Sequence, residues 1–149
     1  MTIKVLFIIG ILCTIVVLAA GIAHALSLPH KIHLAADDYL RAQQLYAGWA
    51  FLGIASIGSL ACAIALSIML RNDAIPFRAM LVASVAVALA LVVFFACTFP
   101  ANQATHNWTI LPDGWEKLRV RWEYSHVAGA ALNAIAVVAE LVAALGWRD

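Results

Sequence analysis

Four long and strongly apolar stretches constrain this chain more than any other feature of its sequence. They cover about residues 5–28, 45–70, 76–99 and 124–147, and within them only Arg78 and Glu140 are charged. A helix needs roughly 20 predominantly apolar residues to cross the hydrocarbon core of a bilayer. Backbone polar groups in lipid must find their partners within the segment, so each stretch is predicted to be a helix. The sequence therefore predicts one all-α domain over residues 1–149, an integral membrane four-helix bundle.

The composition excludes several classes of protein. Of the 149 residues, 65% are hydrophobic and 11% are charged, whereas an ordinary soluble domain has about 45–50% and about 25%. This excludes a soluble globular domain and a disordered chain. It also excludes a nucleic-acid-binding protein, which needs a basic surface that a net charge of +1 does not supply. The expected partners are membrane lipid and a small hydrophobic substrate, with no nucleic acid, and the sequence leaves a homo-oligomer open.

An even number of spans places both termini on one side of the membrane and the polar segments 29–44 and 100–123 on the other. Lysines and arginines number four on the terminal side and five on the loop side, so the positive-inside rule does not decide the orientation. Lys4 in the short N-terminal segment favours cytoplasmic termini, which we predict for this multi-pass protein. The first stretch also resembles a signal peptide ending at Ala23-His24-Ala25. Its apolar run is longer than the roughly 7–15 residues of such a peptide, so we expect it to remain as a helix.

The histidines form the first group of candidate functional residues, because all of them are expected on or just beneath the loop side. His30 and His33 are three residues apart, as are Glu123 and His126, and this spacing brings two side chains to one face of a helix. Imidazole nitrogens suit iron and copper, so the cofactor is expected to be a single iron or copper ion or none at all. The candidate ligands are His24, His30, His33, His106, Glu123 and His126. For His30, His33 and His106, binding a metal ion is the only role that we predict. A di-iron centre is not expected, because the Glu-x-x-His pattern occurs once. The alternative is that these histidines only form hydrogen bonds at the membrane interface.

The fourth stretch carries a line of polar residues. His126, Asn133 and Glu140 recur every seven residues and so lie on one face of a helix. Ionisable groups within a membrane are costly and face the bundle interior or a wet cavity. This line is either a path for protons or water, or a set of interhelical hydrogen bonds, with Arg71 or Arg78 as the expected counter-ion of Glu140.

Two further expectations concern local structure. Small residues including Gly48, Gly53 and Ser59 are expected where helices approach one another closely. Asp113 is expected to cap a helix that begins near Trp115 and continues into the fourth span. The first turns of this helix, after the third span, would form a short lid over the bundle.

The segment from Pro100 to His126 carries two distinctive patterns. The first is Pro-x-Asn followed, after five intervening residues, by Trp108, and the second is Trp-Glu-x-Leu-Arg-x-x-Trp-Glu-x-x-His from Trp115 to His126. Together with the four spans, these patterns resemble the anthrone-oxygenase-like family of four-span membrane proteins, largely a domain of unknown function. Some members are assigned the oxidation of an anthrone to an anthraquinone by molecular oxygen, without an established organic cofactor. The resemblance covers nearly the whole chain and implies an oxygenase or oxidoreductase for a small hydrophobic aromatic substrate.

The resemblance also suggests which residues would do the chemistry. His126 would be the general base, Glu123 would orient its imidazole, and Arg119 would hold the resulting oxyanion. The expected substrate-binding residues are Asn102, Trp108, Trp115, Trp122 and Tyr124. The alternative function is that of a non-catalytic membrane subunit, or of a small-ligand-binding or scaffold protein, whose loop face docks a partner.

Overall fold

The structure is a computed structural model that describes residues 2–148. Its helices in chain order are α1 (Thr2–Lys31), α2 (Ala36–Gln44), η1 (Trp49–Phe51), α3 (Leu52–Met69), α4 (Ala74–Val93), η2 (Phe94–Thr98), α5 (Phe99–Ala104) and α6 (Trp115–Gly146). Four helical segments in it are long and apolar enough to cross a membrane. They are Thr2–Lys31, Trp49–Met69, Ala74–Ala104 and Trp115–Gly146. The predicted all-α, four-span architecture is therefore confirmed.

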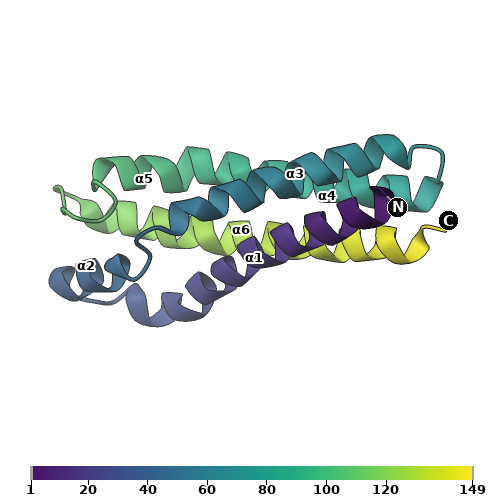
Figure 1. The fold of residues 1–149 in the computed structure, drawn as a ribbon. Helices are drawn as coiled ribbons and strands as arrows, with labels where there is room; N and C mark the ends of the chain where they lie inside the picture. The colour runs from purple at the N-terminus through teal and green to yellow at the C-terminus, as the bar shows by residue number, and fades with distance from the viewer. Residues whose placement is uncertain (1, 149) are drawn as a thin grey trace.

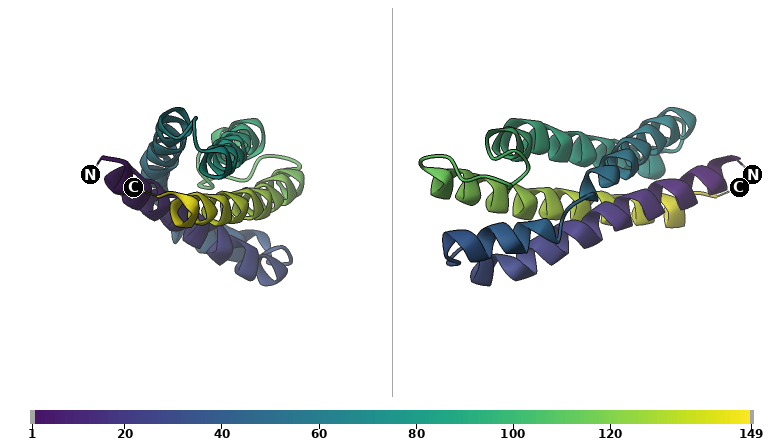
Figure 2. Two further views of the ribbon diagram at one scale, coloured as in Figure 1. Left: turned by 90° about the vertical axis from the view of Figure 1, so that its right-hand side faces the viewer. Right: turned by 60° about the vertical axis from the view of Figure 1, so that its left-hand side comes forward.

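The four long segments form a closed ring of neighbours. Helix α6 packs against α1 and α4, and α3 packs against the same two helices. Both ends of the chain lie at one end of the bundle, while α2, α5 and the connection after α5 lie at the other (Figures 1 and 2). The chain is thus a multi-pass membrane protein, with its longer connections gathered at the end opposite its termini.

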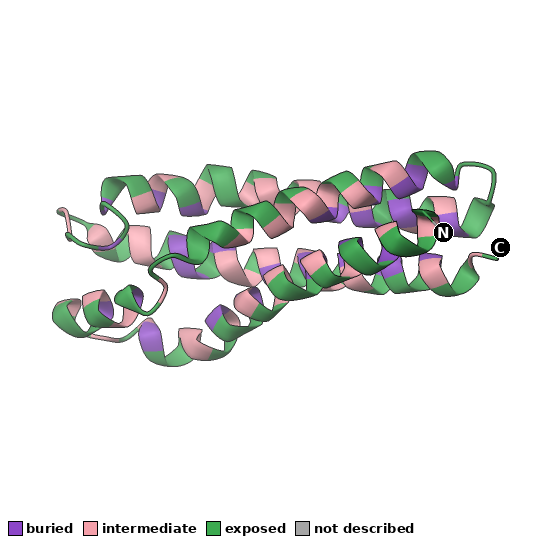
Figure 3. Ribbon diagram, viewed as in Figure 1, coloured by how far each residue is buried: buried purple, intermediate pink, exposed green. Residues whose placement is uncertain are grey.

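The interior of the bundle is rich in alanine, and many large apolar side chains point outward. Ala63, Ala83 and Ala136 are fully buried, whereas Leu26 and Leu145 are 75% and 86% exposed. Buried residues form a narrow strip along the inner faces of the helices, as Figure 3 shows. This distribution suits a lipid surrounding, where association of helices depends on close packing and not on the exclusion of apolar groups from water.

The closest approach of α1 and α6 occurs at Gly21. A Cβ atom placed on Gly21 would lie 3.0 Å from the Cβ and 3.2 Å from the Cα of Ala130, so only glycine fits there without a shift of the helices. Gly48 and Gly53, which were predicted to lie at close approaches, have no atom within 4 Å of such a Cβ. That prediction is wrong for both, and Gly48 instead takes the left-handed φ of 86° before η1.

We expect Gly21→Leu to destabilise the protein by about 1–3 kcal/mol, since the added side chain must push the backbone of α6 away. Gly53→Leu is the matched control, because its surroundings are open. The thermal midpoints of the two variants in detergent would be compared with that of the wild type. Equal midpoints for both variants would contradict the close approach.

The third span continues through Pro100 and does not end before it. Proline has no N–H to donate to the carbonyl four residues earlier, and its ring crowds that carbonyl. Here the helix widens into the π-helical turn η2 just before the proline, and the guanidinium of Arg121 donates a hydrogen bond to the freed carbonyl of Ala96. The helix therefore reaches Ala104, beyond the predicted end at residue 99.

Much of the two predicted polar loops is helical. The first contains α2, and the second consists of α5, a connection over residues 105–114 and the first turns of α6. The residue before α6 is Gly114 in a left-handed conformation, and no side chain caps the helix, so the predicted cap at Asp113 is wrong. The residues expected to form a lid are the continuous start of α6, and α2 covers the same end of the bundle beside α1 (Figure 1).

Candidate functional site

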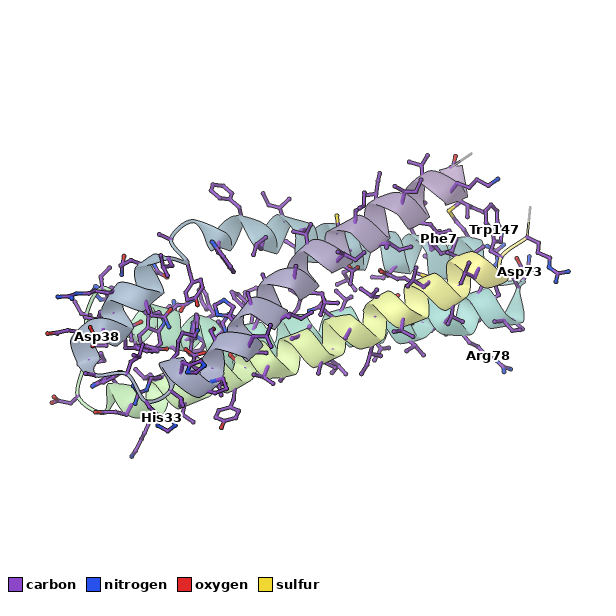
Figure 4. The ribbon with its side chains drawn as sticks, turned by 90° about the horizontal axis from the view of Figure 1, so that it is seen from below. Phe7, His33, Asp38, Asp73, Arg78 and Trp147 are labelled. Carbon is purple, nitrogen blue, oxygen red and sulfur yellow. The ribbon has the colours of Figure 1, made fainter. Side chains whose placement is uncertain are left out.

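The end of the bundle that carries α2 holds a buried polar cluster between α1, α2 and α6. Figure 4 shows His33 and Asp38 at this end and Asp73 and Arg78 at the opposite end. His24 and Lys31 lie seven residues apart and thus on the same face of α1, while Glu123 and His126 lie one turn apart on α6. We call this group, together with Tyr39 of α2, the polar cluster.

At the centre of the polar cluster is an ion pair that is removed from solvent. The Lys31 ammonium lies 3.0 Å from Oε2 of Glu123, and their side chains are 6% and 0% exposed. The Tyr39 hydroxyl donates to the other carboxylate oxygen over 3.0 Å. Burial of Tyr39, together with the adjacent Glu123, raises the pKa of the phenol well above its ordinary value, so this donor keeps its proton. Both carboxylate oxygens are therefore held by a partner.

The second half of the polar cluster is a pair of imidazoles, His24 and His126, with ring centroids 4.2 Å apart. The Lys31 ammonium lies 3.3 Å from Nδ1 of His24. Because an ammonium can only donate, Nδ1 accepts and the proton of a neutral His24 is on Nε2. Nδ1 of His126 lies 2.9 Å from the Trp122 carbonyl, which can only accept, so this nitrogen carries the proton. The pair thus presents an N–H on His24 and a lone pair on His126 Nε2.

Aromatic rings enclose the imidazole pair. The Trp122 ring lies 4.1 Å from His126 and 4.9 Å from His24, and the Tyr46 ring lies 4.3 Å from His24, all between centroids. The ammonium of Lys31 also lies over the rings of Tyr46 and Trp122, at 4.8 Å and 5.2 Å. These contacts surround the one cation of the polar cluster with π faces, which favour it electrostatically.

Asn102 positions two of the tryptophans. Its side-chain oxygen accepts hydrogen bonds from the indole N–H of Trp122 at 2.7 Å and of Trp108 at 3.1 Å. Trp108 is 2% exposed although it belongs to a connection. It is preceded by His106 and Asn107, and all three residues have positive φ angles of 48–61°. Such left-handed residues cost energy, and here they turn the indole of Trp108 inward against Tyr39.

The other predicted site residues lie around the polar cluster or outside it. Arg119 donates to the carbonyl of Leu34 and stacks on Tyr39 and Trp115, so it braces α2 and does not point at the imidazoles. Tyr124 is 56% exposed and faces away from the bundle. Glu123 is bound by Lys31 and Tyr39, so the group that orients His126 is a backbone carbonyl and not Glu123 as predicted.

The structure does not gather the residues assigned to a metal. His30, His33 and His106 are exposed and lie on different segments of the loop end. Within residues 2–148, no three His, Cys, Asp or Glu side chains come together in a way that could hold a metal ion. The polar cluster offers two imidazoles, and the nearby carboxylate is already bound to an ammonium and a phenol. This donor set does not fit an iron or copper centre.

A hollow of about 420 Å³ opens beside the polar cluster on the outer surface of the bundle. Its lining residues are Ala19, Ala20, Gly48, Trp49, Phe51 and Leu52. Trp49 separates the hollow from the imidazoles, since its ring lies 5.6 Å from that of His24. The volume is within the roughly 300–1,000 Å³ of small-molecule sites, and the lining residues belong to α1 and to the start of the second span.

Lys31, Tyr39 and Tyr46 are parts of the site that the sequence interpretation missed. None of the three was among the predicted catalytic, substrate-binding or metal-binding residues. The spacing of His24 and Lys31, two turns apart on one helix face, is a signal in the sequence that links Lys31 to the histidines. No comparable signal links Tyr39 to Glu123, which lies 84 residues away along the chain.

Asn133 and Glu140 of the polar line on α6 are buried and His126 is half-buried, but the three residues have separate partners. Asn133 donates to the Gly129 carbonyl of its own helix. Glu140 lies beside Thr14 of α1, with Oε1 at 2.8 Å from the threonine hydroxyl. Arg71 is exposed and donates to the carbonyl of Ile68, and Arg78 is exposed too, so neither is the expected counter-ion of Glu140.

Comparison with family models, curated proteins and solved structures finds no match for this chain. The fold and the polar cluster define a multi-pass, four-helix membrane protein with a group of interacting ionisable side chains at one end. The resemblance to the anthrone-oxygenase-like family stays a prediction.

Proposed function

We propose that the polar cluster is the active site of an oxygenase that acts on a small hydrophobic aromatic substrate. The observation that carries this proposal is the imidazole pair, in which the half-buried His126 offers a lone pair and the buried His24 an N–H, with ring centroids 4.2 Å apart. A base beside a hydrogen-bond donor is the arrangement needed to remove a proton next to a carbonyl and to hold the resulting enolate oxygen.

The substrate class follows from the surroundings of the imidazoles. Indole and phenol rings line the polar cluster, and the apolar hollow on the outer surface is bounded by Trp49, whose ring lies 5.6 Å from that of His24. A flat aromatic ketone with an acidic methylene, such as an anthrone, could enter there from the bilayer and stack on Trp122. The Lys31–Glu123 ion pair fixes one face of this site, and the Lys31 ammonium keeps the His24 N–H on the nitrogen that faces away from it.

The proposed reaction uses molecular oxygen as the oxidant. His126 Nε2 takes a proton from the substrate methylene, and the enolate oxygen accepts the N–H of His24. The carbanionic carbon forms a C–O bond with dioxygen, and the imidazolium returns its proton to the peroxide. Loss of the remaining hydrogen with cleavage of the O–O bond releases water and leaves a second carbonyl. The methylene thus loses two hydrogens and gains one oxygen, and the other oxygen atom becomes water.

The test is oxygen consumption and quinone absorbance in proteoliposomes supplied with anthrone. We expect His126→Gln to lower the rate by about 10²–10⁴-fold, the usual contribution of general acid–base catalysis. His30→Gln, an exposed histidine on α1, is the matched control and should leave the rate unchanged. A wild-type rate no higher than that of empty liposomes, or an unimpaired His126→Gln variant, would overturn the proposal and favour a non-catalytic membrane subunit.

A further inference from the structure

A second buried polar group lies near the terminal end of the bundle, away from the imidazoles. It consists of Glu140 on α6, Thr14 on α1 and Ser59 on α3, which are 1%, 0% and 1% exposed. Glu140 is six residues from the end of α6 at Gly146, which corresponds to about 9 Å along the helix axis. The carboxyl group therefore sits within the membrane-spanning part of the bundle.

The short contacts within this group indicate which oxygen atoms carry a hydrogen. The Thr14 hydroxyl lies 2.9 Å from the Gly10 carbonyl, 2.7 Å from the Ser59 hydroxyl and 2.8 Å from Oε1 of Glu140. A hydroxyl has one hydrogen to give and can accept two. The Gly10 carbonyl can only accept. All three contacts can be two-centre hydrogen bonds at once only when Thr14 donates to Gly10 and accepts from both Ser59 and a protonated Glu140.

The surroundings of Glu140 also disfavour a charge. The ion pairs among residues 2–148 do not include Glu140, and its Oε2 has no hydrogen-bond partner there. The titratable group beside it is the thiol of Cys62 on α3, which in turn lies near the thiol of Cys13 on α1. The neighbouring helix α4 has one charged residue, Arg78, which is exposed. An ionised carboxylate in such a place would lack any compensating cation.

We infer that Glu140, Thr14 and Ser59 form a proton-binding site within the membrane, in which Glu140 is a neutral carboxylic acid at neutral pH. The ligand of this site is the proton itself, held between α1, α3 and α6. The inference is independent of the oxygenase proposal, because it concerns different residues at the other end of the bundle.

Infrared spectroscopy of the full-length protein in lipid nanodiscs at neutral pH tests this inference. We expect the C=O stretching band of a protonated carboxylic acid, which shifts in D₂O and is lost in Glu140→Gln. Glu116→Gln, which removes an exposed acid from the same helix, should keep the band. Thr14→Val should keep the band and shift it, since the acid loses its hydrogen-bond acceptor. Absence of the band from the wild type would overturn the inference, and this readout does not depend on any variant folding.

A chemical measurement separates a proton site from a site for a metal cation. A hydrophobic carbodiimide reacts with protonated carboxyl groups in apolar surroundings, so it should modify Glu140, as read by mass spectrometry, and spare Glu116. We expect the extent of modification to be the same with sodium or potassium chloride at constant ionic strength. Protection of Glu140 by sodium would show that a cation, and not a proton, occupies the site, and would overturn the inference.

Discussion

Lys31→Met is expected to lower the free energy of unfolding by about 3–5 kcal/mol, the range found when one partner of a buried ion pair is removed. The Glu123 carboxylate would remain fully buried and keep only the Tyr39 hydroxyl as a partner. The cation over the rings of Tyr46 and Trp122 would also be lost. Unfolding of the protein in mixed micelles by sodium dodecyl sulfate measures the effect.

The matched control for this variant is Lys117→Met, which removes an exposed lysine and should change stability by less than about 0.5 kcal/mol. The double variant Lys31→Met with Glu123→Gln gives the coupling energy. We expect it to be less destabilised than the sum of the single variants, because removal of the second charge relieves the buried carboxylate. Equal effects of Lys31→Met and Lys117→Met would show that the ion pair does not contribute to stability.

The second large effect is expected for Asn102→Leu, a change of similar volume that removes one hydrogen-bond acceptor. The indoles of Trp108 and Trp122 would both lose their partner, and these residues are 2% and 4% exposed. An unsatisfied buried donor costs about 1–3 kcal/mol, so the two together predict a loss of about 2–6 kcal/mol. The loss should be larger than for most single substitutions, because one side chain serves two rings.

Gln103→Leu is the control for Asn102→Leu, since it places leucine at an exposed position of the same helix. Tryptophan fluorescence reports on the site directly, and thermal unfolding in detergent reports on stability. We expect Asn102→Leu to change the emission spectrum and lower the thermal midpoint, and Gln103→Leu to do neither. A normal midpoint for Asn102→Leu would mean that the indoles find other acceptors.

The helices were predicted well because their causes are local. The length of an apolar run and the need to pair backbone groups in lipid are both properties of a single segment. The ends of the helices were predicted less well. The third span passes Pro100 because Arg121, a residue from another helix, donates to the carbonyl that the proline leaves free. That hydrogen bond cannot be predicted from the sequence of the third span alone.

The candidate site was predicted in part. Asn102, Trp108, Trp122 and His126 were expected at one site. The structure places His126 in the polar cluster and the other three beside it. The i,i+3 spacing of His30 and His33 suggested a metal ligand pair, yet both side chains are exposed. A spacing shows which side chains share a helix face, but not whether that face turns toward the bundle or away from it.

The sequence by itself determined that this protein is an all-α membrane bundle whose polar residues concentrate at the end with the longer connections. The tertiary structure decided which of these residues meet. It pairs Lys31 with Glu123, joins Tyr39 to the same carboxylate, and stacks His24 on His126. The physical reason is that such contacts depend on the rotation and closeness of helices packed against one another. Gly21 and Ala130 set that closeness for α1 and α6, and no single segment of the chain encodes it.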